Sequence, residues 1–177
     1  VQAGWAALAP LGITSTTRYV CFHIRDSAYL QHALPDRDWS YHDYRNPDPD
    51  AYVPALTALM NEGFTVVRMG KRVASTLPVT HPHLIDYSLW EGKSDFLDVF
   101  LYAHASFAWS GGASGIEQMA TAFNRPLVIT DLVPFQEPRA AVDDCQVTPC
   151  LLREASTGRL LRLSEMMTHR FGSSARY

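Results

Sequence analysis

The stretch from Ser110 to Gly115, SGGASG, contains the residue types best suited to binding an anion. It follows the apolar run Phe107 to Trp109 and precedes a segment with helical spacing of apolar residues. Small residues between a strand and a helix leave backbone N–H groups available to a phosphate, although a ligand-free tight turn would use the same glycines. With the later VITD, the stretch also looks like a dinucleotide-binding fingerprint.

Three features argue against nicotinamide binding. Glu117 follows Gly115 by two residues, where the fingerprint needs a third glycine for close packing of helix on strand. The fingerprint belongs to the first strand–helix turn of a sheet, whereas strand-like runs already precede this turn. Tyr87 and Lys93 are too far apart to form a Tyr-x-x-x-Lys pair. An NAD-dependent oxidoreductase therefore stays only an alternative.

Further polar residues follow other strand-like runs. His23, Arg25 and Asp26 stand at and after the first run, and the guanidinium fork of Arg25 suits a diphosphate, unless it forms an ion pair with a nearby aspartate. Asp95 and Asp98 share one face of a helix, where they either accept hydrogen bonds from a base or sugar or form a solvated acidic face.

These residues need a parallel sheet to bring them together. Helical spacing is expected from Tyr52 to Met60, after a cap at Ser94, and from the glycine turn to Phe123, and a last helix is expected after a cap at Ser164. Alternation of strands and helices predicts an α/β fold, a Rossmann-like parallel sheet with helices on both faces. Ligands of such sheets bind at the carboxyl ends of the strands. The expected strands are Tyr19 to Ile24, Phe64 to Met69, Leu84 to Tyr87, Phe107 to Trp109 and Leu127 to Thr130.

The stretch between Asp26 and Asp50 is long, aromatic and acidic. It holds Trp39, three tyrosines, His32 and His42, with six aspartates among them. Long loops in compact domains are often functional. Aromatic faces beside carboxylates suit a carbohydrate site, and a packed Ω-loop has a similar composition, so both interpretations stay open.

Composition narrows the class of protein. A net charge of −3 with 47% hydrophobic residues indicates a soluble globular domain without a nucleic-acid or membrane-surface partner. No apolar run reaches the length of a membrane helix, and the N-terminus lacks the pattern of a signal peptide. Three cysteines without metal-site spacing predict reduced thiols and a cytoplasmic protein, with a Cys145–Cys150 bridge as the alternative.

Three stretches resemble, in order and spacing, a family of bacterial glycosyltransferases linked to surface polysaccharides. They are CFHIRDSAYLQHALPDRDWSYHDYRN, VVRMG and IDYSLWEGKSDFLDVFLYAHASFAWSGGASGIEQMATAFNRPLVITDLVP. The family is distantly similar to the fucosyltransferase superfamily of GT-B fold, whose His-x-Arg motif after a strand holds the donor diphosphate. Here that motif is His23-Ile24-Arg25. The last motif of those fucosyltransferases is serine-rich rather than glycine-rich, which leaves the donor sugar and its base open.

The resemblance implies a donor-binding set and a domain arrangement. Residues 18–177 would form the C-terminal nucleotide-sugar-binding domain, and residues 1–17 a connecting helix or linker from an N-terminal domain that completes the active site. The predicted catalytic residues are Arg25 and Asp26. The predicted donor-binding residues are His23, Arg25, Asp95, Asp98, Ser110, Gly111, Gly112, Ser114 and Gly115.

The implied reaction is transfer of fucose or a related sugar from a nucleotide-sugar donor to a glycan acceptor. Arg25 and the glycine turn would stabilise the diphosphate leaving group without a metal or cofactor, since no Asp-x-Asp motif follows a strand. The general base stays open among Asp26, Asp36, His42 and Asp43. A non-catalytic nucleotide- or sugar-binding module is the alternative from another class.

Overall fold

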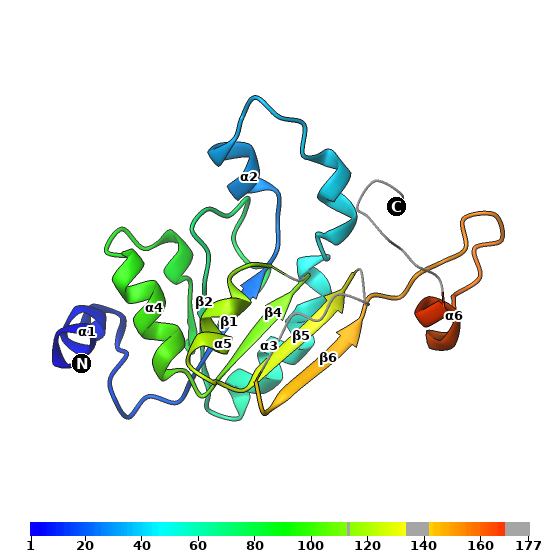
Figure 1. Ribbon diagram of the computed structural model, residues 1–177. Coiled ribbons are helices and arrows are strands. Elements are labelled where there is room, and N and C mark those ends of the chain that lie inside the picture. Colours follow the sequence, from blue (N-terminus) through cyan, green and yellow to red (C-terminus); the bar gives the residue numbers. More distant parts are fainter. Residues whose placement is uncertain (113, 134–141, 169–177) are drawn as a thin grey trace.

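The computed structural model describes residues 1–112, 114–133 and 142–168 of the chain. Its centre is a single sheet of six strands in the order β3-β2-β1-β4-β5-β6, in which every pair of neighbours is parallel. The strands are β1 (Tyr19–Ile24), β2 (Thr65–Arg68), β3 (Leu84–Ile85), β4 (Phe107–Gly111), β5 (Leu127–Leu132) and β6 (Cys145–Pro149). Figure 1 shows the strands fanned across the middle of the molecule.

The strand order decides where a ligand can bind. It is the order 3-2-1-4-5-6 of dinucleotide-binding sheets, in which the connections reverse direction between strands 1 and 4. At that point the loops after β1 and β4 diverge to opposite sides and leave a crevice beyond the carboxyl ends of both strands. The Rossmann-like α/β fold predicted from the sequence is therefore confirmed.

Helices cover both faces of the sheet, as predicted. One apolar cluster joins the sheet to α1, α4 and α5, and a second joins it to α3. The apolar run of β1 serves both clusters, because Cys21 points to the first while Val20 and Phe22 point to the second. The helices are α1 (Gln2–Leu8), α2 (Ala28–Ala33), α3 (Val53–Asn61), α4 (Asp95–His104), α5 (Glu117–Ala122) and α6 (Leu163–Thr168), with single 3-10 turns at Ala9–Leu11, Ser40–Arg45, Pro49–Tyr52 and Tyr87–Leu89.

The N-terminal segment packs on the domain. Leu8 and Ile13 are fully buried, and Trp5 packs edge-on against Phe100 of α4 with ring centroids 4.8 Å apart. A side chain at Gly4 would meet the Phe100 ring at 2.5 Å. Residues 1–17, expected to be a connecting helix or linker, contribute buried side chains to the core, and their role as a connection to an additional N-terminal domain stays a prediction.

Several element boundaries differ from those expected. The third strand ends at Ile85 because Tyr87 begins a 3-10 turn, and β6, a partly exposed edge strand with the polar sequence CQVTP, was not predicted. Ser164 was expected to cap the last helix, but α6 begins at Leu163, and the Glu165 carboxylate accepts the N–H of Arg162 at 2.7 Å.

The cysteines are free thiols. Cys145 begins β6 and Cys150 follows its end, so an extended strand separates them by about 16 Å. A disulfide needs Cα atoms less than about 7 Å apart, so the alternative of a bridge between them is wrong. Within the described residues, no helix combines the length and apolar character needed to cross a membrane.

Candidate functional site

A cavity of about 650 Å³ opens at the carboxyl edge of the sheet, beside the point where the strand order reverses. Residues from β1 and the segment after it, from the loop after β2, from the start of α4 and from the start of α5 surround it. Its lining comprises His23, Arg25, Asp26, Tyr29, Leu30, Arg45, Lys71, Arg72, Asp95, Ser114, Gly115, Ile116 and Met119.

The lining is positively charged although the protein is not. Four basic side chains, Arg25, Arg45, Lys71 and Arg72, face only two carboxylates, while the whole chain carries a net charge of −3. Like charges gathered in a recess raise the local concentration of ligands of opposite sign. The cavity is therefore suited to an anionic ligand.

Arg25 is held by neutral oxygen atoms. Its backbone N–H donates to the Gly111 carbonyl at 2.8 Å, and its Nη1 donates to the carbonyl of His42 at 3.3 Å and to Oδ1 of Asn46. Among the residues that the structure describes, no carboxylate oxygen lies within 4.0 Å of this guanidinium. The alternative of an ion pair with a nearby aspartate is thus not observed.

Electrostatics at Arg25 also favour an anion. Burial, followed by repulsion from the neighbouring Arg45, lowers the pKa of Arg25 from its ordinary value. Two guanidinium groups that disfavour each other's charge become more stable when an anion binds between them.

His23 lines the cavity, whereas Ser110, its neighbour on β4, is buried and is not part of the lining. They are opposite each other in the β1–β4 register, on the face covered by α4 and α5. Burial lowers the pKa of His23 to about 4, and the charges of Arg68 and Arg25 act in the same direction. Nδ1 of His23 and the buried Oγ of Ser110 have no hydrogen-bond partner among the described residues.

Asp26 lines the cavity, but backbone groups use its carboxylate. Oδ1 accepts the N–H of Ala28 at 2.9 Å, and Oδ2 accepts the N–H of Ala74 at 2.8 Å. The side chain thereby joins the turn after β1 to the loop that carries Lys71 and Arg72. This geometry makes Asp26 a positioning residue for the cavity wall, and its predicted catalytic role stays a prediction.

The other candidate bases lie outside the lining. Asp36 is exposed on the segment between β1 and α3, the His42 ring contacts that of Tyr41 at a tilt of 36°, and Asp43 accepts a hydrogen bond from Nδ2 of Asn46 at 3.0 Å.

The two aspartates of α4 have different surroundings. Asp95 lines the cavity, forms an ion pair with Lys71 and has a side chain that is 87% exposed. Asp98 does not line the cavity, and its carboxylate interacts with the hydroxyl of Tyr87 instead. Of this pair, only Asp95 is placed to contact a ligand.

The residues of the glycine turn also differ in whether they line the cavity. Gly111 and Gly112 are absent from the cavity lining and have packing roles. A Cβ at Gly111 would lie 2.5 Å from the Tyr52 hydroxyl oxygen, and one at Gly112, whose φ is +80°, would lie 2.5 Å from the Arg45 carbonyl oxygen. Ser114 and Gly115 do line the cavity, and a Cβ at Gly115 would meet nothing within 4 Å.

A capping interaction occupies part of this turn. The backbone N–H of Ser114 donates to Oε2 of Glu117 at 3.2 Å, and Glu117 is 1% exposed. Ser-x-x-Glu is the sequence signature of a helix capping box, so this interaction could have been predicted.

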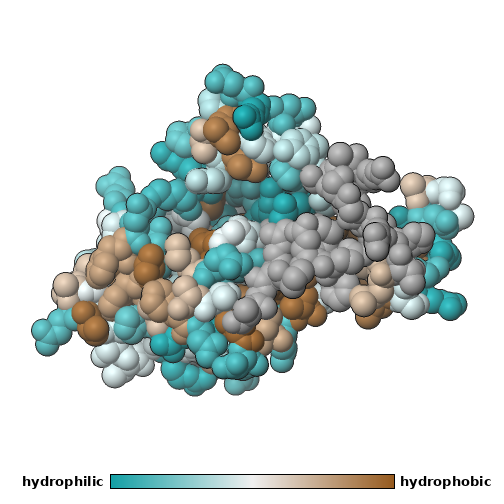
Figure 2. All heavy atoms as spheres, in the orientation of Figure 1, coloured by the Kyte–Doolittle hydropathy of each residue, from teal (hydrophilic) through white to brown (hydrophobic). Residues whose placement is uncertain are grey.

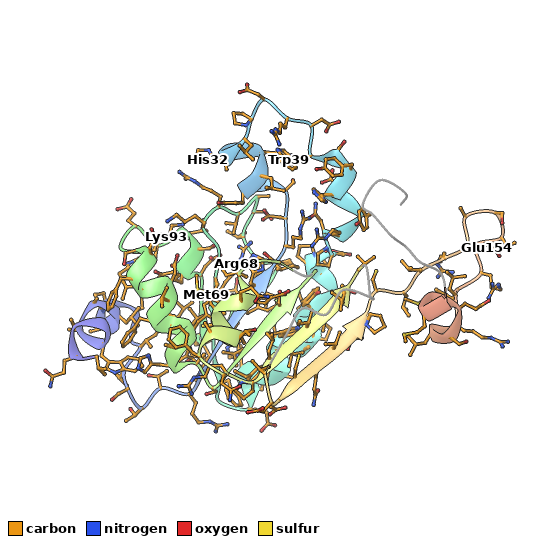
Figure 3. The ribbon with its side chains drawn as sticks, in the orientation of Figure 1. His32, Trp39, Arg68, Met69, Lys93 and Glu154 are labelled. Atoms are coloured by element: carbon orange, nitrogen blue, oxygen red, sulfur yellow. The ribbon has the colours of Figure 1, made fainter. Side chains whose placement is uncertain are left out.

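A buried ion pair lies at the ends of the neighbouring strands β2 and β3. Arg68, at the end of β2, is 2% exposed and donates to Oδ2 of Asp86 at 3.0 Å. Figure 3 shows Arg68 near the edge of the sheet, below Trp39 and His32 of the segment after β1. Arg45, Lys71 and Arg72 line the cavity but are not among the predicted site residues, because no local motif marks them.

Comparisons with known proteins give one finding. No protein-family model matches the chain, and no curated protein matches it in sequence. Among solved structures, the chain is similar to E. coli ADP-heptose LPS heptosyltransferase II, with 18% sequence identity and a TM-score of 0.49. The similarity covers 83% of this chain and 43% of that chain, so the present chain spans less than half the length of that protein.

Proposed function

We propose that this chain is a nucleotide-sugar-binding domain of a glycosyltransferase. The observation that carries the proposal is the cationic cavity at the strand-order reversal of a 3-2-1-4-5-6 sheet. Its volume of about 650 Å³ lies within the range of small-molecule sites. The resemblance of the His23-Ile24-Arg25 motif to glycosyltransferases of GT-B fold supports the same class.

The lining suggests how such a ligand would lie. Arg25, Arg45 and Arg72 would bind the diphosphate, because planar guanidinium groups bond phosphate oxygens in pairs. Tyr29, Ile116 and Met119 supply an apolar wall for the base. His23, neutral at pH 7, would donate or accept a hydrogen bond with a sugar hydroxyl without adding charge.

In the proposed reaction the bond between the anomeric carbon and the diphosphate breaks, and the diphosphate leaves with its negative charge. Arg25 and Arg45 would stabilise that charge where it develops, and the fixed loop around them would lower the reorganisation needed. The acceptor oxygen would form the new bond to the anomeric carbon while its proton passes to a base, for which Asp26, Asp36, His42 and Asp43 stay the predicted candidates. Fucose or a related sugar is the proposed group transferred.

Calorimetric titration with GDP, UDP, ADP and NAD tests the binding. We expect one nucleoside diphosphate to bind, and Arg25→Gln to weaken it by about tenfold or more, because a hydrogen bond to a charged group is lost. Arg18→Gln is the control, since Arg18 is exposed and precedes β1 at the opposite edge of the sheet. Binding of NAD alone, or equal effects of both variants, would overturn the proposal.

A second assay separates a transferase from a non-catalytic binding module. Release of nucleoside diphosphate from the sugar nucleotide whose diphosphate binds is measured on the protein that joins this chain to the predicted N-terminal domain, with and without an oligosaccharide acceptor. A transferase should show release that Arg25→Gln lowers by about a hundredfold. Tight binding without release would favour the module.

A further inference from the structure

The segment from residue 27 to residue 46, here called the projecting segment, stands out from the body of the domain. It contains α2 and the 3-10 turn Ser40–Arg45, and in Figure 1 it rises beyond the carboxyl edge of the sheet. No residue from 25 to 51 is buried, although this stretch includes Trp39 and three tyrosines. A packed Ω-loop buries its own side chains, so that interpretation of the sequence does not fit.

Three rings of the projecting segment form a cluster, here called the aromatic cluster, in which each ring contacts the other two and the Trp39 and Tyr41 centroids are 6.0 Å apart. Trp39 and His42 are nearly parallel, at 12° with centroids 6.0 Å apart, and the Tyr41 ring lies 4.2 Å from that of His42. Tyr41 is 46% exposed. Burial, followed by the charges of Arg25 and Arg45, lowers the pKa of His42, so the His42 ring is uncharged at neutral pH.

Hydrogen bonds hold the aromatic cluster in place. Nε1 of Trp39 donates to the Leu34 carbonyl at 3.1 Å, Oδ1 of Asp38 accepts the N–H of Ser40 at 2.9 Å, and Nη1 of Arg25 donates to the His42 carbonyl at 3.3 Å. A surface that is already ordered loses little conformational entropy when it binds a ligand. The hydrogen bond from Arg25 also connects the aromatic cluster to a residue that lines the cavity.

The charge of the segment restricts the ligand. Three aspartates, at positions 36, 38 and 43, outnumber the arginines at positions 37 and 45, and a surface without net positive charge is poorly suited to nucleic acid. Figure 2 shows hydrophilic side chains over most of the segment, with hydrophobic groups among them. Flat apolar rings beside carboxylates match a saccharide, which has C–H faces and a rim of hydroxyl donors.

We propose that the projecting segment is a saccharide-binding platform. The rings of Trp39, Tyr41 and His42 pack against C–H faces of a sugar chain, and the exposed carboxylate of Asp36 accepts its hydroxyl groups. Tyr29, Leu30 and Arg45 of the same segment line the cavity. The assignment of this saccharide as the glycan acceptor rests on the proposed function, whereas the platform itself does not.

An oligosaccharide array tests the platform. The probes are immobilised linear tetrasaccharides to hexasaccharides of glucose, galactose, rhamnose and N-acetylglucosamine, with a single-stranded oligonucleotide on the same array. Trp39→Ala and Tyr41→Ala are compared with Phe123→Ala, a matched control that is 41% exposed and follows α5 near the opposite edge of the sheet. Neither ring belongs to a buried core cluster, so we expect both variants to fold.

We expect retention on at least one saccharide, reduced about fivefold to tenfold by Trp39→Ala and by Tyr41→Ala and unchanged by Phe123→Ala. Nucleoside diphosphate titration of the same variants should be unaffected. Retention on no saccharide, retention only on the oligonucleotide, or equal retention by all variants would overturn the platform. Failure of the proposed donor site is seen separately, as absence of nucleoside diphosphate binding while saccharide retention persists.

Discussion

His23 and Arg25 are two residues apart, yet they contribute different chemistry to one cavity. The side chain of His23 stays with the sheet, where burial removes its charge, while Arg25 follows the end of β1 and is held by the oxygen atoms of His42 and Asn46. The cavity therefore combines positively charged side chains with a neutral polar residue. Because burial keeps folded His23 uncharged, the free energy of unfolding should depend on pH over a measurable range.

The His23→Gln variant tests that window. Folded His23 stays neutral down to its pKa of about 4, whereas the unfolded chain binds a proton below about pH 6.5. As the pH falls from 6.5 toward 4, the unfolded state takes up a proton that the folded state refuses, and stability is lost. The wild-type free energy of unfolding should therefore decrease more steeply than that of the variant in urea unfolding curves, and parallel curves would contradict a buried neutral histidine.

Gly112 and Gly115 allow a matched test of the turn. Gly112→Ala should lower the free energy of unfolding by about 2 kcal/mol or more, because the added Cβ meets the Arg45 carbonyl at a positive φ. Gly115→Ala should change it by less than about 0.5 kcal/mol, because its surroundings are open. Chemical denaturation measures both, and equal losses would contradict the division between packing and cavity-lining glycines.

At the scale of elements, helix starts show which local signals were reliable. Ser94 has extended backbone geometry, and its Oγ accepts the N–H of Leu97 at 3.2 Å, as predicted for the cap of α4. Ser164 has a similar local sequence but lies within α6. The same residue type therefore has a capping role in only one of the two helices.

Substitutions at these serines should separate the two roles. Ser94→Ala should cost about 1 kcal/mol of stability, since the N–H of Leu97 loses its acceptor. Ser164→Ala should change stability by less than about 0.5 kcal/mol, because alanine is favoured inside a helix. Thermal unfolding checks the pair, and a larger loss at Ser164 would contradict the observed start of α6.

At the scale of the whole molecule, α1 packs into the core of the domain. Leu8 is fully buried in the cluster that also contains Phe100 and Leu101 of α4. The segment before β1 thus packs against α4, whose first residue, Asp95, lines the cavity.

Truncation of Leu8 tests this packing. Leu8→Ala should lower the free energy of unfolding by about 3 kcal/mol, since it removes fully buried methyl groups and leaves a cavity. Leu89→Ala, at a side chain that is 54% exposed, is the control and should cost less than about 1 kcal/mol. A negligible effect at Leu8 in urea denaturation would show that the segment is dispensable.

The sequence alone was sufficient for the fold class and for five of the six strands, because buried parallel strands form continuous apolar runs such as YVCFHI. It failed for β6, whose partly exposed edge position removes that signal. Of the predicted site residues, His23, Arg25, Asp26, Asp95, Ser114 and Gly115 line the cavity, whereas Asp98, Ser110, Gly111 and Gly112 do not. The residues that follow β1 and β4 meet there because the carboxyl ends of parallel strands share an edge.

Tertiary structure alone decided which polar residues face the cavity. It brought Arg45 and Arg72 there from loops without local motifs, and it gave Gly111 and Gly112 packing roles against Tyr52 and the Arg45 carbonyl. It also removed the charge of His23 by burial. Each of these outcomes depends on contacts between residues distant in the chain, whereas periodicity and capping patterns report only on local neighbours.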